Sequence, residues 1–214
     1  MSRRPYGRKV PGPRRQRPGR FVQIVLGVCV ALASAYGWYG HQAQNAPDTA
    51  THLSRPNASN ATEYVGRVVR VADGDSVDFQ TAGRTLKIRL DSVDAPEIGD
   101  GGKRPGQPFA QQSREHLQKW LSGRTVTAHC YETDQYGRAV CALVDPTGAS
   151  AGSAQVSAGF AWAYTAARGK YLRDASLPAL QTSARQARLG LWQHADPIRP
   201  WQWRYDCWQN KQCR

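Results

Sequence analysis

The stretch that decides the fold covers residues 65–90 and reads VGRVVRVADGDSVDFQTAGRTLKIRL. It contains three β-rich runs, separated by the turn-forming residues Asp73-Gly-Asp75 and Ala82-Gly83. In the last run, Leu86 to Leu90, apolar and polar side chains alternate, which is the period of a strand with one buried face. The stretch therefore predicts a meander of three short strands.

The rest of the chain adds helices and two more strands to this meander. Helices are predicted over residues 108–121, 151–158 and 177–189, each closed by a nearby glycine, and strands over 124–131 and 138–144. Several short strands with a few interspersed helices favour an α+β domain, a small barrel with about three helices packed outside it. We expect this domain over residues 63–204, with a cysteine-containing tail at 205–214.

The N-terminal part of the chain is typical of an exported protein. Residues 1–20 hold eight Arg or Lys side chains and no acid, and residues 21–40 carry no charge and are long enough to span a membrane. The basic flank predicts a cytoplasmic N-terminus and export of the rest, as a protein anchored in the inner membrane and facing the periplasm or exterior. A cleaved signal peptide, which would release the protein, fits the same residues. Residues 41–62 are rich in Ala, Asn, Thr, Ser and Pro and are predicted to be a flexible linker.

Composition limits the class of protein further. The 214 residues are 40% hydrophobic and 21% charged, which excludes a wholly disordered chain, and no heptad or longer repeat is visible. The net charge is +13, of which residues 1–20 contribute +8. The basic balance therefore says less about a nucleic-acid partner than the total suggests.

Four cysteines outside the apolar segment fit an oxidising compartment. Cys130 and Cys141 flank a predicted hairpin, where opposed residues of the two strands lie within disulfide range, and Cys207 and Cys213 lie six apart in the tail. Two local disulfides are predicted on this basis. Reduced, packed cysteines are the alternative, and the spacing suits no zinc site.

Three short segments carry the chemistry: Asp73-Gly-Asp75, the run from Arg89 to Glu97 that ends Asp94-Ala-Pro-Glu, and Asp134-Gln-Tyr-Gly-Arg138. Each lies at the end of a predicted strand, where sites on a rigid scaffold are usually built. Carboxylates and a backbone carbonyl are oxygen ligands suited to Ca²⁺ or Mg²⁺. Arginines nearby would bind a phosphate, because a guanidinium matches phosphate oxygens with two parallel hydrogen bonds.

Together these segments closely resemble the staphylococcal nuclease-like, or thermonuclease, family over about residues 64–204. The resemblance includes VADGDSV at 71–77, IRLDSVDAPE at 88–97, DQYGR at 134–138, GFAWAY at 159–164 and RLGLW at 188–192. It implies a five-stranded OB-fold β-barrel with three helices. The tail from Asp196 to Arg204 resembles the Pro-Trp-x-Trp-Arg ending of many bacterial relatives.

The resemblance also implies roles for single residues. Asp75, Asp94 and the Ala95 carbonyl would bind Ca²⁺, Glu97 would orient or deprotonate the attacking water, and Arg89 and Arg138 would bind the phosphate. Tyr136 and Tyr164 would contact the nucleotide and its terminal phosphate.

The function implied is calcium-dependent hydrolysis of phosphodiester bonds in DNA and RNA, preferably single-stranded or frayed, leaving 3′-phosphates. The alternative is a non-catalytic OB-type module that binds nucleic acid, as degenerate domains of this family do. Nothing in the sequence demands more than a monomer, and the membrane would be contacted through residues 21–40 if the leader is retained.

Overall fold

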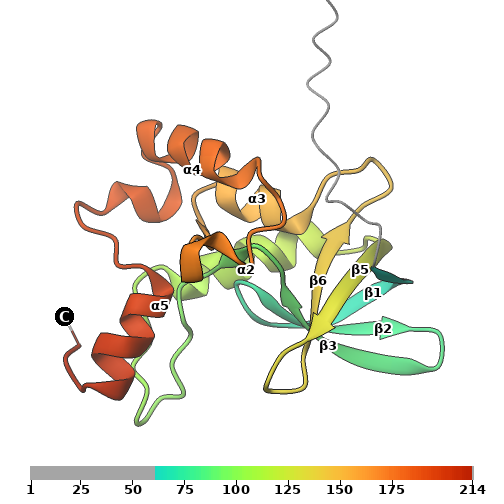
Figure 1. Cartoon of the computed structure of the whole chain (residues 1–214), viewed down its shortest axis with the longest axis horizontal. Coiled ribbons are helices and arrows are strands. Elements are labelled where there is room, and N and C mark those ends of the chain that lie inside the picture. Colours follow the sequence, from blue (N-terminus) through green and yellow to red (C-terminus); the bar gives the residue numbers. More distant parts are fainter. Residues whose placement is uncertain (1–60, 214) are drawn as a thin grey trace, which may run out of the picture. The chain divides into compact units, whose positions relative to one another are not determined.

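The computed structural model describes residues 61–213, and five of its strands close into a barrel (Figure 1). These strands are β1 (Thr62–Asp73), β2 (Ser76–Thr81), β3 (Arg84–Leu90), β5 (Val126–Thr133) and β6 (Ala139–Val144). Their order is β1-β2-β3-β6-β5, closed by antiparallel pairing of β1 with β5, and only the β3–β6 pairing among them is parallel. The meander of three strands is thus confirmed, and the barrel fits the α+β, OB-like prediction.

The barrel core follows the alternation seen in the sequence. Val77 and Phe79 from β2 and Ile88 and Leu90 from β3 are all at most 2% exposed, and they meet Leu117 of helix α2 (Ala110–Leu121). Burial of a large apolar side chain contributes about 1.5–3 kcal/mol. This packing makes one end of the barrel a rigid base for the turns that leave it.

The helices lie together on one side of the barrel (Figure 1). They are α2 (Ala110–Leu121), α3 (Ala151–Ser157), α4 (Leu177–Gln186) and α5 (Pro200–Trp203), with 3₁₀ turns η1 (Ala167–Gly169) and η2 (Gly190–Gln193) and the π-helix η3 (Arg204–Gln209). Helix α4 ends at Gln186 rather than at residue 189, since Arg188 adopts a left-handed φ of 52°.

Helix α5 and η3 were not predicted from the sequence. Pro200 starts α5 at its first turn, where a proline costs no hydrogen bond, and Trp203 is only 4% exposed. The π-helix follows α5 directly and runs through the boundary placed between residues 204 and 205.

A pair of two-residue strands, β4 (Val93–Asp94) and β7 (Trp162–Ala163), lies outside the barrel sheet. They pair antiparallel, with Asp94 opposite Trp162. Two residues are too few for a hydrophobic period, so the sequence offered no signal for this pairing. Its effect is to fix the backbone of Asp94 against the helical layer.

The predicted basic region, apolar segment and linker, residues 1–20, 21–40 and most of 41–62, lie outside the described residues. Within residues 61–213, no helix combines the length and the apolar character that crossing a membrane requires.

Both cysteine pairs expected from the sequence are at disulfide distance. Cys130 and Cys141 are direct partners across β5 and β6, with Cα atoms 4.0 Å apart, and Cys207 and Cys213 have Cα atoms 4.1 Å apart. The first pair fastens a barrel hairpin, and the second closes the end of the chain onto η3.

Replacing the first pair by Cys130→Ala/Cys141→Ala is expected to lower the free energy of unfolding by about 2–4 kcal/mol. The bridge closes a loop with a sequence separation of 11, which restricts the unfolded chain, and Cys141 is fully buried. Urea denaturation at neutral pH measures the effect. An unchanged midpoint would show that the pair is reduced in solution.

Candidate active site

The turn between β1 and β2 brings two carboxylates to one end of the barrel. Gly74 lies between Asp73 and Asp75, and a Cβ at Gly74 would collide with the side chains of Ser113 and Ala95. Only glycine therefore lets this turn approach α2 so closely. The Asp75 side chain is 4% exposed, and its Oδ1 accepts a hydrogen bond from the Ser76 hydroxyl at 3.0 Å.

Arg89 lies opposite this turn and links two of the predicted acids. It pairs with Ser76 in the β2–β3 register, so its side chain reaches over the end of the barrel. Its guanidinium forms ion pairs with both Asp75 and Asp94. Asp94 is fully buried, and the Arg89 side chain is 17% exposed. The structure thus brings together predicted site residues from two of the three motifs, the Asp73-Gly-Asp75 turn and the run from Arg89 to Glu97.

The loop after Asp94 positions Ala95 and Glu97. The Ala95 amide donates to Asp75 Oδ2 at 2.7 Å, so this loop is tied to the β1–β2 turn. The Glu97 backbone forms two hydrogen bonds with Gln107. The Glu97 amide donates to the side-chain Oε1 of Gln107 at 3.2 Å, and the Glu97 carbonyl accepts from the backbone N–H of Gln107 at 2.8 Å. These bonds close the loop and aim the Glu97 side chain back toward Asp94. Metal binding by the Ala95 carbonyl stays a prediction.

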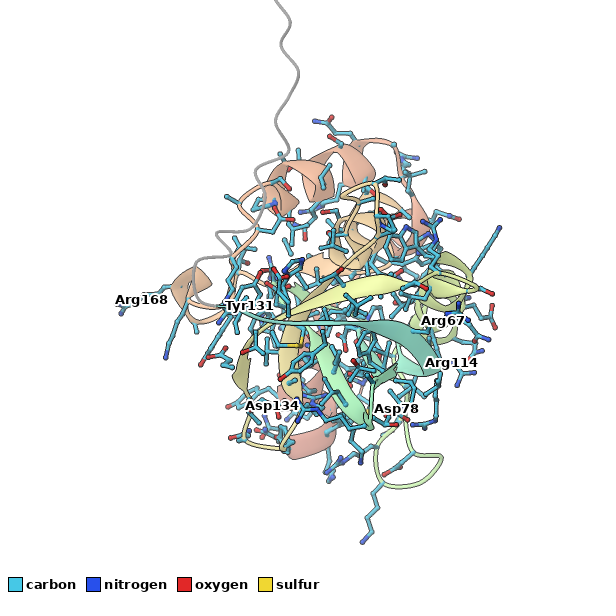
Figure 2. The ribbon with its side chains drawn as sticks, turned by 90° about the vertical axis from the view of Figure 1, so that its right-hand side faces the viewer. Arg67, Asp78, Arg114, Tyr131, Asp134 and Arg168 are labelled. Atoms are coloured by element: carbon cyan, nitrogen blue, oxygen red, sulfur yellow. A yellow bond between two sulfur atoms is a disulfide. The ribbon has the colours of Figure 1, made fainter. Side chains whose placement is uncertain are left out.

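Arg138 joins this group from the β5–β6 hairpin. Its Nη1 donates to the Ser76 hydroxyl at 3.3 Å, one hydrogen bond away from Asp75. Asp134, labelled in Figure 2, holds Arg138 in place, with Nε and Nη2 of the guanidinium each 2.8 Å from Asp134 Oδ2. Tyr136 is 74% exposed, and its ring lies 5.5 Å from Arg138 Cζ. An exposed ring beside a guanidinium suits stacking on a base.

Tyr164 follows β7 and lies at the edge of the same cluster. Its amide donates to the Ser92 carbonyl at 2.8 Å, and its ring meets the rings of Trp201 and Tyr171 at 5.4 and 6.1 Å. Burial, and then the nearby Asp94 carboxylate, raise the pKa of the Tyr164 hydroxyl. Trp201 packs edge-on against Tyr164 and Trp162.

Two further residues of the cluster were given no role from the sequence. Arg204 of η3 binds Asp94 with its Nη2 at 2.9 Å from Oδ2, and it also forms an ion pair with Glu97. Asp73 has a buried Oδ1 with no hydrogen-bond partner among the described residues. The sequence held both residues in quoted motifs, Asp73 in the turn and Arg204 at the end of Pro-Trp-Gln-Trp-Arg, but gave no sign that they meet.

Electrostatics distinguish these side chains. Burial, and then repulsion from Glu97 and Asp94, raise the pKa of Asp73 to about 7, against an opposing attraction to Arg89. Burial, and then Asp94, raise the pKa of Glu97, although Arg204 opposes the shift. Burial alone would lower the pKa of Arg204, but attraction to Asp94 and Glu97 outweighs it and raises that pKa. Four carboxylates thus share one barrel end with two embedded guanidiniums, which leaves an excess of negative charge.

The chemistry of these donors fits a hard cation. All are oxygens, and the partnerless Asp73 Oδ1 is a buried acceptor beside them. Within residues 61–213, however, no three acid, His or Cys side chains converge closely enough to form a ready-made metal cage. In this arrangement the carboxylates of Asp75, Asp94 and Glu97 form ion pairs with Arg89 and Arg204.

The fold and the site together define an OB-like α+β barrel whose strand ends carry paired carboxylates and arginines. A family model described as "Staphylococcal nuclease homologue" matches residues 87–194, and the chain belongs to this family. The family expected from the sequence, and with it the class of nuclease hydrolases, is therefore confirmed.

Individual relatives agree with this assignment. The chain is 38% identical over 140 residues to an "Uncharacterized endonuclease" of Escherichia coli O157:H7, which covers 65% of this chain and 84% of that protein. It is 33% identical over 153 residues to a "Micrococcal nuclease" of Shigella flexneri, covering 66% and 81%. A "Staphylococcal-like nuclease CAN1" of Arabidopsis thaliana is 31% identical over 121 residues, covering 56% and 34%.

Proposed function

We propose that this protein is an exported nuclease that uses Ca²⁺ to hydrolyse phosphodiester bonds of DNA and RNA. The observation that carries the proposal is the cluster at the barrel end. There Arg89 forms ion pairs with Asp75 and Asp94. Arg138 donates a hydrogen bond to the Ser76 hydroxyl, which in turn donates to Asp75. Membership of the nuclease family and the names of the relatives support the same chemistry.

The roles of the side chains follow from their charge and position. Glu97, whose carboxylate faces the cluster, orients a water molecule and accepts its proton as the water attacks phosphorus in line with the leaving 5′ oxygen. Arg89 and Arg138 bind the phosphate oxygens and stabilise the charge that develops on them. Preorganised donors of this kind commonly contribute about 10²–10³ each to the rate.

The cation would be held by Asp75 and Asp94, with Asp73 as a further oxygen donor beside them. When bound, it would supply positive charge to the phosphate and lower the pKa of a water molecule. Its entry requires Arg89 and Arg204 to give up some of their bonds to these acids, and the excess negative charge of the cluster favours that exchange.

Substrate form and location extend the proposal. An OB-type barrel binds backbone and stacked bases rather than sequence, so single-stranded or frayed nucleic acid is preferred. The resemblance to the family implies that the products carry 3′-phosphates. The exposed Tyr136 is suited to such stacking. The apolar segment 21–40 supports export, either as a membrane anchor or as a cleaved signal, and two cysteine pairs at disulfide distance fit an oxidising compartment.

Purified residues 41–214 are expected to cleave heat-denatured DNA with Ca²⁺ and to lose this activity when the ion is chelated. The acids of the cluster need a cation to bring a polyanionic substrate beside them, so chelation removes both binding and rate. Product gels with Ca²⁺, with Mg²⁺ and with chelator measure the effect.

The matched control is Asp75→Ala/Glu97→Ala, which should be inactive under every condition. Binding of DNA without cleavage under every metal would instead identify a nucleic-acid-binding module of this fold.

A further inference from the structure

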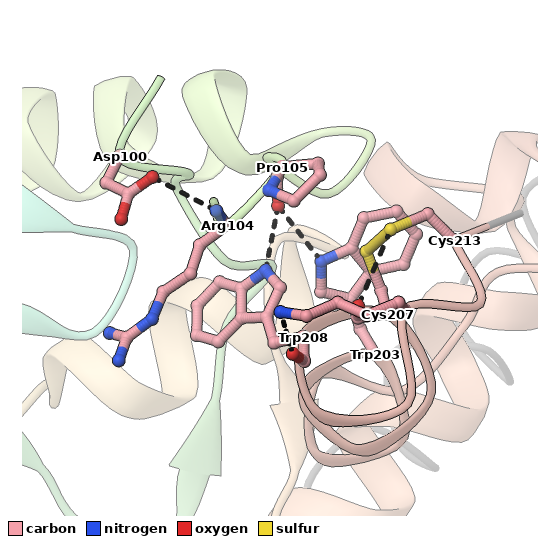
Figure 3. Close-up of a disulfide and its surroundings, with 8 residues drawn as sticks. Asp100, Arg104, Pro105, Trp203, Cys207, Trp208 and Cys213 are labelled. Carbon is pink, nitrogen blue, oxygen red and sulfur yellow. Dashed lines mark hydrogen bonds between the residues drawn. A yellow bond between two sulfur atoms is a disulfide. The ribbon is translucent and has the colours of Figure 1, made fainter. Parts of the chain in front are cut away.

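The C-terminal segment, residues 200–213, packs on the loop that carries Glu97 (Figure 3). Trp203 and Trp208 both donate their indole N–H to the Pro105 carbonyl, at 3.3 and 2.9 Å. Gln107, which closes the Glu97 loop, donates to the Ile198 carbonyl at 2.6 Å. The position of this loop is therefore set by residues about a hundred positions further along the chain.

A disulfide and a cation–π contact fix the C-terminal segment itself. Cys207 is 1% exposed and is bonded to Cys213, which closes the last residues of the chain onto η3 (Figure 3). The Arg104 guanidinium lies 5.4 Å from the Trp208 ring. The disulfide thus holds the segment at its C-terminal end, and the contact between Arg104 and Trp208 holds it against the loop.

Arg204 is the residue through which this segment reaches the reacting groups. It lies one residue after the buried Trp203 and three before the buried Cys207. Its guanidinium spans Asp94 and Glu97, with Nη1 3.1 Å from Asp94 Oδ1 and Nη2 2.9 Å from Asp94 Oδ2. Among the described residues, Arg204 is the one hydrogen-bonding partner of the Glu97 carboxylate.

Without this partner, the two acids would repel each other. Asp94 is fully buried and Glu97 is 15% exposed, so water screens their charges poorly. A guanidinium that binds both carboxylates removes the repulsion and fixes the direction of each, because its donors lie in a rigid plane. A lysine, with one point charge, cannot reproduce that fork.

We propose that Arg204 is a positioning residue, which holds the Glu97 carboxylate toward the reacting phosphate and is itself kept in place by the disulfide-closed C-terminal segment. The inference rests on the proposed nuclease function and assigns part of its active site to residues 200–213. Arg204 acts through Glu97 and Asp94 and needs no contact with the substrate.

Arg204→Gln is expected to lower kcat about 100-fold and to leave KM for DNA within about threefold, since a small misplacement of a reacting group costs that much. Arg204→Lys should recover part of the loss. Arg124→Gln is the matched control, because Arg124 also pairs with a buried acid, Asp145, at 2.6 Å. That pair lies at the end of the β5–β6 hairpin opposite to Arg138, so kcat should not change.

A second measurement, on the protein without DNA, separates positioning from a structural role. Arg204→Gln should bind Ca²⁺ in calorimetry about fivefold more tightly than the parent, because a competing positive charge has been removed. Cys207→Ser/Cys213→Ser, which frees the segment, should lower kcat in the same direction by about tenfold.

Each other result overturns the inference. If Arg204→Gln cleaves DNA as fast as the parent, the inference about Arg204 is wrong and the proposed function stands. If the parent is inactive with every metal, the proposed function itself is wrong. A rise in KM with little change in kcat would place Arg204 on the phosphate. Weaker Ca²⁺ binding together with partial unfolding would make Arg204 merely structural.

Discussion

Arg138→Ala is expected to lower kcat for DNA cleavage about 100- to 1000-fold while changing the free energy of unfolding by about 1 kcal/mol or less. The large kinetic effect follows from removing one preorganised donor to the charge that develops on phosphorus. The small effect on stability follows from its surroundings, since Arg138 and Asp134 are 30% and 18% exposed and pair on a hairpin loop. Initial rates with denatured DNA, measured beside urea denaturation, check both parts.

Arg173→Ala is the matched control for this prediction. Arg173 also pairs with an acid of the β5–β6 hairpin, Glu132, at 2.9 Å, but its guanidinium forms no ion pair with the acids of the cluster. It should leave kcat unchanged. An Arg138→Ala protein that loses activity only in proportion to its folded fraction would contradict the role proposed for Arg138.

Arg89 cannot give such a clean test, although the resemblance implies the same role for it. It is wedged between Asp75 and Asp94, whose side chains are 4% and 0% exposed. Removing one partner of a buried ion pair leaves an uncompensated charge, at a cost of about 3–5 kcal/mol. Loss of activity in Arg89→Ala would therefore mix lost chemistry with lost folding.

Local patterns were enough to predict most of the barrel. The alternation from Leu86 to Leu90 is realised in β3, and the cysteines flanking the predicted hairpin face each other across β5 and β6. What closes the barrel is not local. The parallel pairing of β3 with β6 and the pairing of β1 with β5 join distant segments, and no short-range period encodes such a choice.

The candidate site likewise combines residues in local motifs, which can be predicted, with residues brought in from distant parts of the chain, which cannot. Asp75, Asp94 and Arg89 lie in short motifs at strand ends, and those motifs could be read from the sequence. Arg204 lies 110 positions from Asp94, and its role depends on how the last helical turn packs. In the sequence, Asp73 is indistinguishable from an ordinary aspartate in a turn, and only its burial beside the other acids sets it apart.

Glu97→Gln is expected to lower kcat about 10²- to 10⁴-fold, the range over which general bases contribute. The change is nearly isosteric, and both hydrogen bonds between residues 97 and 107 use the backbone of residue 97 and not its side chain. The amide oxygen can still accept from Arg204. The loop is therefore expected to keep its place, and the loss reports the missing carboxylate.

The buried position of Glu97 also predicts that its neutral form is tolerated. Burial and Asp94 both raise the pKa of Glu97, so the charged form is already disfavoured there relative to water. A glutamine removes that cost, but it weakens the pairing with Arg204, and the two effects on stability oppose each other. Thermal unfolding should change little, while single-turnover rates on denatured DNA fall steeply.

Glu132→Gln is the matched control, since Glu132 is also paired with an arginine but lies outside the cluster. It should cleave DNA like the parent. A Glu97→Gln protein that retained more than about a tenth of the parent rate would exclude general-base catalysis by Glu97. Its carboxylate would then serve to balance the charge of Arg204, and the proton of the attacking water would have to pass to another acceptor.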